Sequence, residues 1–456
     1  MKVVICGAGL VGYNIAKFLI AENNDVTVVD NDPVLVASIN DNLDCRGMLG
    51  HASSPTALEK SGLGDADMII AVTRVDEINM IACHIAHTLF NVPRKLARIR
   101  EQSYLSPKWR TMFSNDAIPI DVIISPEKEV ANAIIRRINA CGAVDIMPME
   151  NENIVMIGVK VKSDSIILND TVSKVLASSE YKDLTMNVMT INRNGNVFLS
   201  SVDTVLEADD EIYFVCDIKQ VKYCLVLFGY EEKESKRFVI IGGGNIGSFL
   251  AKEYEDKNVI IIEKDSSHSR KLAEKFPNIV VINGDSLDLT ILEEANINKG
   301  DICISVTNDD ETNLLTSLLA KNIGAERIIG LANNPAYGDL LKKLSLDLLV
   351  NPSKITSSVI LKNILYGVIK TRYSVYDNHA YILELKVAKK SELLGKQIKD
   401  IKLPKKCFLG LIIRDKKLCE AKFDIQLQVG DRVVVSTEIE NHKKLVDLFT
   451  PLQEFY

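Results

Sequence analysis

The stretch VVICGAGLVG, residues 3–12, decides the fold of the first half of this chain. Four apolar residues run directly into three glycines spaced as Gly-x-Gly-x-x-Gly, namely Gly7, Gly9 and Gly12. A strand that turns into a helix in this way directs free N–H groups and the positive end of the helix dipole at one spot, which suits a pyrophosphate. Gly7 permits the tight turn, Gly9 lets the backbone approach the phosphate, and Gly12 lets the helix pack closely against the strand.

An acidic residue follows at the distance that a dinucleotide site requires. The apolar run of residues 26–29 ends in Asp30. A carboxylate at the end of this second strand accepts hydrogen bonds from an adenosine ribose, and a charge-assisted bond of this kind contributes roughly 1.5–3 kcal/mol. The same negative charge repels a 2′-phosphate. The pattern therefore favours NAD(H) over NADP(H).

The whole arrangement occurs a second time, half a chain later. The stretch FVIIGGGNIG occupies residues 238–247, and the apolar run 259–262 ends in Glu263. Lys264 follows Glu263 and changes the charge around the expected ribose. Each copy contains a strand, the glycines, a helix, a second strand and an acid, in this order. This complete and duplicated arrangement is far more specific than a single glycine motif. The alternative is a pair of Rossmann-like folds that bind no nucleotide.

The repeat extends beyond the glycines. Residues 67–73 correspond to residues 301–307, and each segment is an apolar strand that ends in a threonine. Strands that alternate with helical stretches predict a parallel sheet with right-handed crossovers. Thr73 and Thr307 then fall just past the carboxyl ends of strands, where open sheets of this kind hold ligands.

Composition narrows the class of protein. The chain has 456 residues, 25% of them charged, and a formal net charge of −7, so a sequence-independent grip on nucleic acid is not expected. The nine cysteines form no Cys-x-x-Cys pair, which favours reduced thiols in a cytoplasm over disulfides or a zinc site. No apolar run approaches the roughly 18 residues that span a bilayer, and the first strand starts too early for a signal peptide.

Each Rossmann-like unit is followed by a helical stretch that begins with proline, at residues 126–138 and 352–365. In the first stretch, Val130, Ile134 and Ile138 recur at helical spacing and predict an apolar stripe. The stripe fits either a helix that faces its own core or a crossover helix that docks on a neighbouring subunit.

The remainder of each half has the texture of short strands and turns, at residues 154–217 and 381–437. Arg193 matches Arg414, and Asp210 matches Asp431, so this small module is duplicated as well. The fold class is therefore α/β, with two Rossmann-like doubly wound parallel sheets, each followed by a small β/α module. The expected divisions are a first Rossmann domain at 1–125, a crossover helix at 126–143, a small module at 144–228, a second Rossmann domain at 236–351, a crossover helix at 352–366 and a second small module at 367–456, with a charged connection at 229–236.

This order resembles the TrkA-type regulatory subunits of the Trk potassium-uptake system, in which RCK (KTN) nucleotide-binding domains alternate with TrkA-C domains. The resemblance covers essentially all of the chain. It implies a protein that is not an enzyme but forms a cytoplasmic ring of several chains, such as a tetramer, on the inner face of the membrane beneath a potassium channel subunit. Nucleotides in the clefts then change the opening of the channel. The expected ligands are NAD(H) and also ATP or ADP, which the resemblance does not assign to a cleft.

The resemblance also implies the residues of each cleft. The first cleft is expected to use Gly7, Ala8, Gly9, Leu10, Val11 and Gly12, with Asp30 on the ribose, Thr73 and Arg74 along the flank, Arg98 near the phosphates and His51 in the lining. The second cleft is expected to use Gly242, Gly243, Gly244, Asn245, Ile246, Gly247, Glu263, Thr307 and Asn308. Leu331 falls where Arg98 would be repeated. His51 stands where the second half has Asp285, and the alternative for His51 is an ordinary histidine in a surface loop.

The competing hypothesis is an NAD-dependent oxidoreductase with tandem Rossmann domains. Such an enzyme needs a general acid or base beside the nicotinamide and a substrate pocket, usually on a separate domain. Small duplicated modules suit ligand sensing or assembly better, and no catalytic residue is identified. His84 and His87 lie three positions apart, but no further ligand joins them at metal-binding spacing, so no metal site is predicted.

Overall fold

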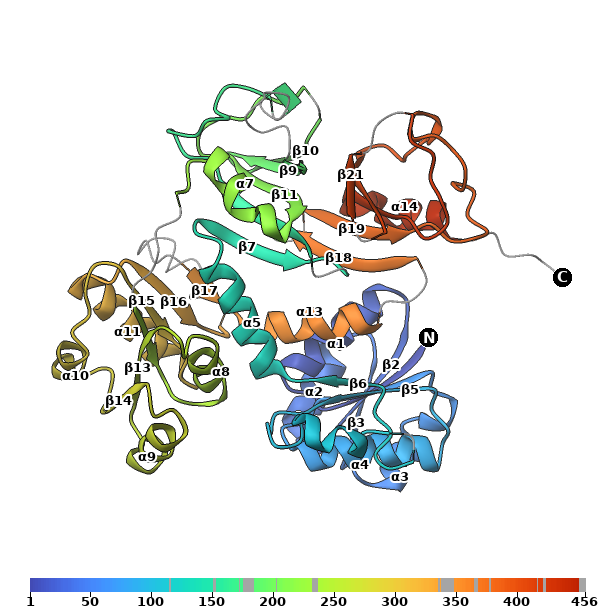
Figure 1. The fold of residues 1–456 in the computed structure, drawn as a ribbon. Helices are drawn as coiled ribbons and strands as arrows, with labels where there is room; N and C mark the ends of the chain where they lie inside the picture. The colour runs from blue at the N-terminus through green and yellow to red at the C-terminus, as the bar shows by residue number, and fades with distance from the viewer. Residues whose placement is uncertain are drawn as a thin grey trace. The chain divides into compact units, whose positions relative to one another are not determined.

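The structure, a computed structural model, divides into two compact units, residues 1–134 with 235–363 and residues 135–234 with 364–456 (Figure 1). It describes residues 1–450 apart from 115, 151–152, 172, 175–183, 202, 232–236, 335–336, 338–347, 365–367, 377–378, 416 and 421–423. Most of the predicted charged connection, residues 232–236, therefore lies outside the described residues, as does the end of the second predicted crossover helix.

The first sheet is parallel and has the strand order β3-β2-β1-β4-β5-β6. Its strands are β1 (Lys2–Cys6), β2 (Asp25–Asp30), β3 (Arg46–Leu49), β4 (Met68–Ala71), β5 (Arg94–Arg98) and β6 (Val122–Ile124). The chain starts in the middle of the sheet, builds outward to β3 and then returns to β4 on the other side of β1. Such a reversal opens a crevice at the carboxyl ends of β1 and β4. The predicted doubly wound sheet is confirmed.

Helices cover both faces of this sheet. They include α1 (Leu10–Ala21), α2 (Pro33–Asn42) and α4 (Asp76–Thr88). The short helix α3 (Pro55–Lys60) and 3₁₀ turns at Leu63–Asp65 and Pro107–Met112 lie in the connections, and α5 (Pro126–Ile138) follows β6. Helix α2 begins where Asp32 accepts the N–H groups of Val34 and Leu35, with Pro33 in its first turn. The stripe Val130, Ile134 and Ile138 on α5 is buried.

The second sheet repeats the first, with the order β14-β13-β12-β15-β16-β17, again parallel. Its strands are β12 (Arg237–Ile241), β13 (Asn258–Glu263), β14 (Val280–Asn283), β15 (Asp301–Ser305), β16 (Arg327–Leu331) and β17 (Leu348–Val350). Its helices are α8 (Asn245–Glu253), α9 (Ser266–Lys275), α10 (Leu289–Glu294), α11 (Asp310–Ile323) and α13 (Pro352–Ile364). The duplication seen in the sequence is thus a duplication of topology.

The other unit contains two antiparallel five-stranded sheets with the same connectivity, β7-β8-β11-β9-β10 and β18-β19-β22-β20-β21. The first comprises β7 (Ala143–Pro148), β8 (Ile154–Lys160), β9 (Met186–Arg193), β10 (Asn196–Leu199) and β11 (Glu211–Asp217), followed by a 3₁₀ turn (Ile218–Gln220) and α7 (Val221–Leu227). The second comprises β18 (Ile369–Val375), β19 (Ala380–Lys386), β20 (Cys407–Arg414), β21 (Lys417–Glu420) and β22 (Arg432–Glu438), with 3₁₀ turns at Ile398–Asp400 and Ile439–Asn441 and helix α14 (His442–Phe449). The predicted small β/α module occurs twice.

Candidate nucleotide-binding clefts

The first glycine of each motif is required by the turn itself. Gly7 has φ +112° and Gly242 has φ +101°, a region that other residues rarely adopt. A Cβ at Gly7 would also lie 3.1 Å from the backbone nitrogen of Thr73, and one at Gly242 would lie 3.0 Å from that of Thr307. These glycines bring the turn after the first strand close to the strand end that carries the threonine.

The third glycine is required by packing between the helix and the strand. A Cβ at Gly12 would lie 1.8 Å from the carbonyl oxygen of Gly7, and one at Gly247 would lie 2.0 Å from that of Gly242. No side chain fits there. The role predicted for Gly12 and Gly247 is thus explained by the fold alone.

The middle glycine is different, because the fold does not require it. Gly9 and Gly244 are the N-caps of α1 and α8, with φ of −63° and −60°, which any residue can adopt. A Cβ at either position would meet no atom within 4 Å. Each glycine therefore leaves open space in front of a helix N-terminus, where the free N–H groups suit an anion.

The two acids hold the glycine turns in place. Asp30 accepts the N–H of Ala8 at 2.6 Å through one carboxylate oxygen and the N–H of Asp32 at 2.9 Å through the other. Glu263 does the same with Gly243 and Asp265, both at 2.9 Å. Each carboxylate oxygen has a second lone-pair site for a ligand hydroxyl. These acids can therefore both tether the turn and bind a ribose.

The far side of the first cleft is organised by Asn79, which is fully buried on α4. Its Oδ1 accepts the backbone N–H of Thr73 at 2.9 Å and the Thr73 hydroxyl at 2.7 Å. Its Nδ2 donates to the carbonyl oxygens of Thr73 at 3.2 Å and Arg98 at 2.9 Å. One amide thus joins the ends of two neighbouring strands, β4 and β5.

Asn313 repeats this network in the second cleft. Its Oδ1 accepts the N–H of Thr307 at 2.8 Å and the Thr307 hydroxyl at 2.7 Å, and its Nδ2 donates to the carbonyl of Leu331 at 3.1 Å. Asn79 and Asn313 thus each belong to the architecture of one cleft, and neither is among the residues expected from the sequence.

Arg98 marks the main difference between the clefts. Its Nε is buried and has no hydrogen-bond partner among the described residues, and burial lowers the pKa of its guanidinium. A buried donor without a partner indicates a group that lacks its acceptor. Leu331, which is buried, takes this place in the second half, and the exposed Arg74 corresponds to Asn308. Two arginines of the first half, Arg74 and Arg98, therefore have no cationic counterpart in the second half.

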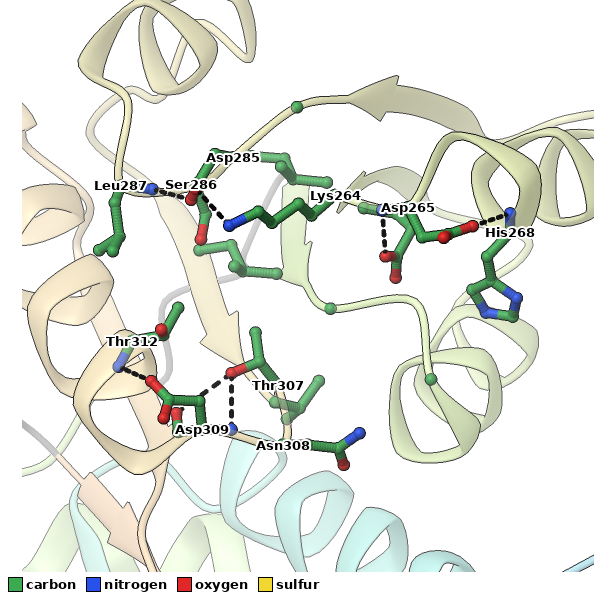
Figure 2. A pocket seen from close by; sticks show the side chains of 17 residues that line it. Lys264, Asp265, His268, Asp285, Ser286, Leu287, Thr307, Asn308, Asp309 and Thr312 are labelled. Atoms are coloured by element: carbon green, nitrogen blue, oxygen red, sulfur yellow. Dashed lines mark hydrogen bonds and ion pairs between the residues drawn. The ribbon is translucent and has the colours of Figure 1, made fainter.

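The second cleft contains a cavity of about 500 Å³ (Figure 2). Five residues predicted from the sequence line it: Gly242, Gly244, Glu263, Thr307 and Asn308. The other predicted residues, Gly243, Asn245, Ile246 and Gly247, support the turn and are not among its lining residues. The structure adds Ile241, Ile262, Lys264, Asp265, His268, Gly284, Asp285, Ser286, Leu287, Val306, Asp309 and Thr312.

Most of the acids in this cavity cap backbone N–H groups. Asp265 accepts the N–H of His268 at 2.7 Å, and Asp309 accepts that of Thr312 at 2.7 Å. Asp265 and Asp309 are the N-caps of α9 and α11, and an acid directly before a helix is a signal that the sequence itself carries. The ring of His268 turns back onto the glycine loop, with its Nε2 2.9 Å from the carbonyl oxygen of Gly243.

His51 lies in the loop after β3, where its Nδ1 is 2.8 Å from the hydroxyl of Ser53. It is exposed, and its counterpart Asp285 lines the second cavity. Its assignment to the first cleft stays a prediction.

Within the described residues, no three His, Cys, Asp or Glu side chains are grouped to hold a metal ion, and no helix has both the length and the apolar character needed to cross a membrane.

Comparison with known proteins agrees with this architecture. A model of the TrkA-N domain matches residues 3–126 and 238–352, and a model of the TrkA-C domain matches residues 382–450. The Trk system potassium uptake protein TrkA of Azorhizobium caulinodans is 39% identical over the full length of both chains, and that of Haemophilus influenzae is 34% identical over 99% of both. The solved structure described as the GsuK channel bound to NAD superposes with a TM-score of 0.60 and 17% identity, over 98% of this chain and 78% of the other. On the strength of its full-length relatives and its matched domains, the chain belongs to the TrkA family of Trk system potassium uptake proteins.

Proposed function

We propose that this chain is a nucleotide-binding regulatory subunit that controls a membrane potassium channel or transporter of the Trk type. It acts without catalysis, in the cytoplasm, as a ring of several chains on the inner face of the membrane. NAD(H) is the proposed ligand of both clefts, and ATP or ADP are further ligands. The names of the full-length relatives support the potassium transport system, and the GsuK structure supports NAD in a cleft of this fold.

The observation that carries the proposal is the space in front of Gly9 and Gly244. The fold explains the other glycines, but it gives no reason for a glycine at these two positions. A pyrophosphate at the N-terminus of α1 or α8 supplies that reason, because any side chain would occupy its place. The same space is found in both copies of the motif.

The remaining groups fit the rest of a dinucleotide. Asp30 and Glu263 stand at the ends of β2 and β13, where a ribose hydroxyl would donate to them. In the first cleft the Nε of Arg98 lacks an acceptor, which a phosphate oxygen would provide. The residues therefore suit an anionic ligand with an adenosine at one end.

The polar groups of the second cavity favour binding over catalysis. Glu263, Asp265 and Asp309 each accept a backbone N–H, and Asp285 forms an ion pair with Lys264. A general acid or base must be able to exchange a proton with its substrate. Carboxylates that are already committed to backbone and ion-pair contacts serve better as fixed parts of a binding site.

Occupancy can change the shape of the domain through the two asparagines. Asn79 and Asn313 connect the cleft wall at Thr73 and Thr307 to the next strand end, so a ligand on one wall acts on both. A ligand shifts an equilibrium only by its difference in affinity for the two states, typically about 1–3 kcal/mol between coupled sites. Two clefts in each chain of a ring add such contributions and steepen the response.

The test blocks each cleft without disturbing the fold. Gly9→Phe and Gly244→Phe introduce a side chain where the backbone accepts one and where the Cβ meets no atom within 4 Å, so both variants should fold. We expect each to weaken NADH at its own cleft by roughly 100-fold, and the double variant to lose both binding events in calorimetry. Nucleotide-dependent potassium flux through vesicles that contain the membrane subunit should be lost in parallel.

Leu89→Phe is the matched control, because Leu89 is exposed and caps the C-terminus of α4, at the opposite end of the helix from the cleft. It should bind NADH and regulate flux like the wild type. The proposal fails if the double variant binds NADH with undiminished affinity. It also fails if the chain converts NADH to NAD in the presence of a carbonyl substrate.

A further inference from the structure

An ion pair between Lys264 and Asp285 lies at the end of the second cleft where the adenosine would bind. Lys264 directly follows Glu263 after β13, and Asp285 lies in the loop after the adjacent strand β14. The Nζ of Lys264 is 2.7 Å from the Oδ2 of Asp285, and Figure 2 shows the lysine extended along the cavity toward that carboxylate. Both side chains line the cavity.

Lys264 has the position from which a basic residue can recognise a 2′-phosphate. In this fold the acid after the second strand accepts the ribose 2′-hydroxyl, and a neighbouring cation accommodates a 2′-phosphate in proteins that use NADP(H). Glu263 is fixed on the glycine turn by the N–H groups of Gly243 and Asp265. A ribose bound to Glu263 would therefore place its 2′-oxygen next to Lys264.

Asp285 forms an ion pair with the ammonium group of Lys264. Its Oδ1 accepts the N–H of Leu287 at 3.0 Å while its Oδ2 holds Lys264, so the carboxylate is fixed from both sides. The hydrogen bond from Lys264 is the main reason that the pKa of Asp285 lies below its usual value, and the acid is charged at neutral pH. A phosphate near Lys264 would meet the negative charges of both Glu263 and Asp285.

The first cleft is built without this pair. Asn31 and His51 stand at the corresponding positions, and His51 contacts Ser53 instead. A ribose bound to Asp30 would have Asn31 beside it in place of a lysine. The second cleft alone therefore combines a cation suited to a 2′-phosphate with an acid that neutralises it.

We propose that Asp285 is a specificity-determining residue of the second cleft, which excludes 2′-phosphorylated dinucleotides by keeping Lys264 in an ion pair. The inference rests on the proposed function, since it assumes that this cleft binds a dinucleotide. It makes discrimination against NADPH depend on two residues, Glu263 and Asp285, in the second cleft. In the first cleft the discrimination depends on Asp30.

The experiment measures the ratio of the NADPH and NADH dissociation constants in the full chain with the first cleft blocked by Gly9→Phe. In this background NADH should bind more tightly than NADPH. Asp285→Asn should reduce the ratio by at least tenfold, mainly through tighter NADPH, because Lys264 is released. The asparagine keeps an oxygen for the N–H of Leu287, so the loop is preserved.

The double change Lys264→Met with Asp285→Asn is the matched control and should restore the preference for NADH. The proposal is overturned if NADH binds and Asp285→Asn leaves the ratio unchanged, or if the double change retains the gain. If the Gly9→Phe background binds neither NADH nor NADPH, the proposed function of the second cleft fails, and the role of Asp285 fails with it.

Discussion

At the scale of single residues, Asn79 and Asn313 link the fold to the clefts. Both side chains are buried. Each forms hydrogen bonds with the backbone of the cleft threonine, just past the end of one strand, and with a backbone carbonyl at the end of the next strand. Removing such a side chain leaves several backbone groups without partners, which costs more than the hydrogen bonds themselves contribute. A substitution here should therefore affect both stability and binding.

Asn79→Ala should destabilise the first Rossmann domain by roughly 2–4 kcal/mol, because the N–H of Thr73 and the carbonyl of Arg98 lose their partner. It should also weaken the binding of NADH at the first cleft and leave binding at the second cleft unchanged. Asn313→Ala should destabilise the second Rossmann domain and weaken the binding of NADH at the second cleft only. Thermal melting and NADH titration of each variant, with the other cleft blocked by Gly244→Phe or Gly9→Phe, test this. Equal weakening of both clefts by either change contradicts the local role.

The glycines and acids of the clefts could be predicted from the sequence because their roles depend on neighbours close along the chain. Gly7 and Gly12 meet within one turn, and Asp30 ends the next strand. Asn79 could not be identified in this way, since its contact with Arg98 depends on the pairing of β4 with β5. The pairing of Lys264 with Asp285 likewise depends on the adjacency of β13 and β14.

At the scale of elements, each small module contains a half-buried arginine that pairs with a buried aspartate. Arg414 at the end of β20 donates through Nε and Nη2 to Asp431 at 2.8 and 2.7 Å, and its Nη2 also donates to the carbonyl of Gln426. Arg193 and Asp210 repeat the pair in the first module, with both bonds at 2.8 Å. A two-pronged bond of this kind fixes the strand end to the loop before the next strand.

Asp431→Ala should open the second module locally, since it leaves the Nε of Arg414 and the N–H of Gln428 without their acceptor. Removing the buried partner of such a pair costs roughly 2–4 kcal/mol. Hydrogen exchange measured on peptides from β20 and β22 should accelerate accordingly. Asp424→Ala, an exposed acid nearby, is the control and should leave exchange unchanged. Similar exchange in the two variants would show that the pair does not hold the module closed.

Short strands were predicted within residues 154–217 and 381–437, but β7 and β18 lie before these ranges, and the packing of the strands was not predicted. In β8, Val155 and Ile157 face the core beneath α7, while Ile154 and Met156 face a second core. Alternate residues of a strand point to opposite faces, so a continuous apolar run indicates burial on both sides. The run was visible in the sequence. The pattern of apolar residues in one strand does not show which surface covers its second face, because that depends on tertiary contacts.

At the largest scale, the two small modules of one chain share that second core. It joins Met156, Met189 and Val215 of the first module to Ile382 and Val434 of the second. Hydroxyl groups fix the contact at its edges, because Tyr373 donates to the carbonyl of Pro148 and Tyr376 to that of Glu211 at 2.7 Å. The duplication of the module thus provides each copy with a partner inside the same chain.

One buried charge interrupts this shared surface. The carboxylate of Glu384 on β19 is fully buried and accepts the N–H of Glu150, from the first module, at 2.8 Å and the hydroxyl of Thr371 at 3.1 Å. Arg432 lies 3.0 Å from Glu384 and 2.8 Å from the carboxylate of Glu150. Burial is the main reason that the pKa of Glu384 lies above its usual value, despite the nearby arginine.

The sign of the pH dependence follows from this shift. Between the ordinary glutamate pKa, about 4.3, and the raised value, the folded chain holds more protons than the unfolded chain, so its stability falls as pH rises. Glu384→Gln cannot titrate. As the pH rises from the ordinary glutamate pKa through the raised pKa of Glu384, the wild type should therefore lose stability relative to Glu384→Gln, which scanning calorimetry of both proteins measures. Glu392→Gln, an exposed site, should follow the wild type. If Glu384→Gln follows it too, the contact between the modules does not depend on the protonation of Glu384.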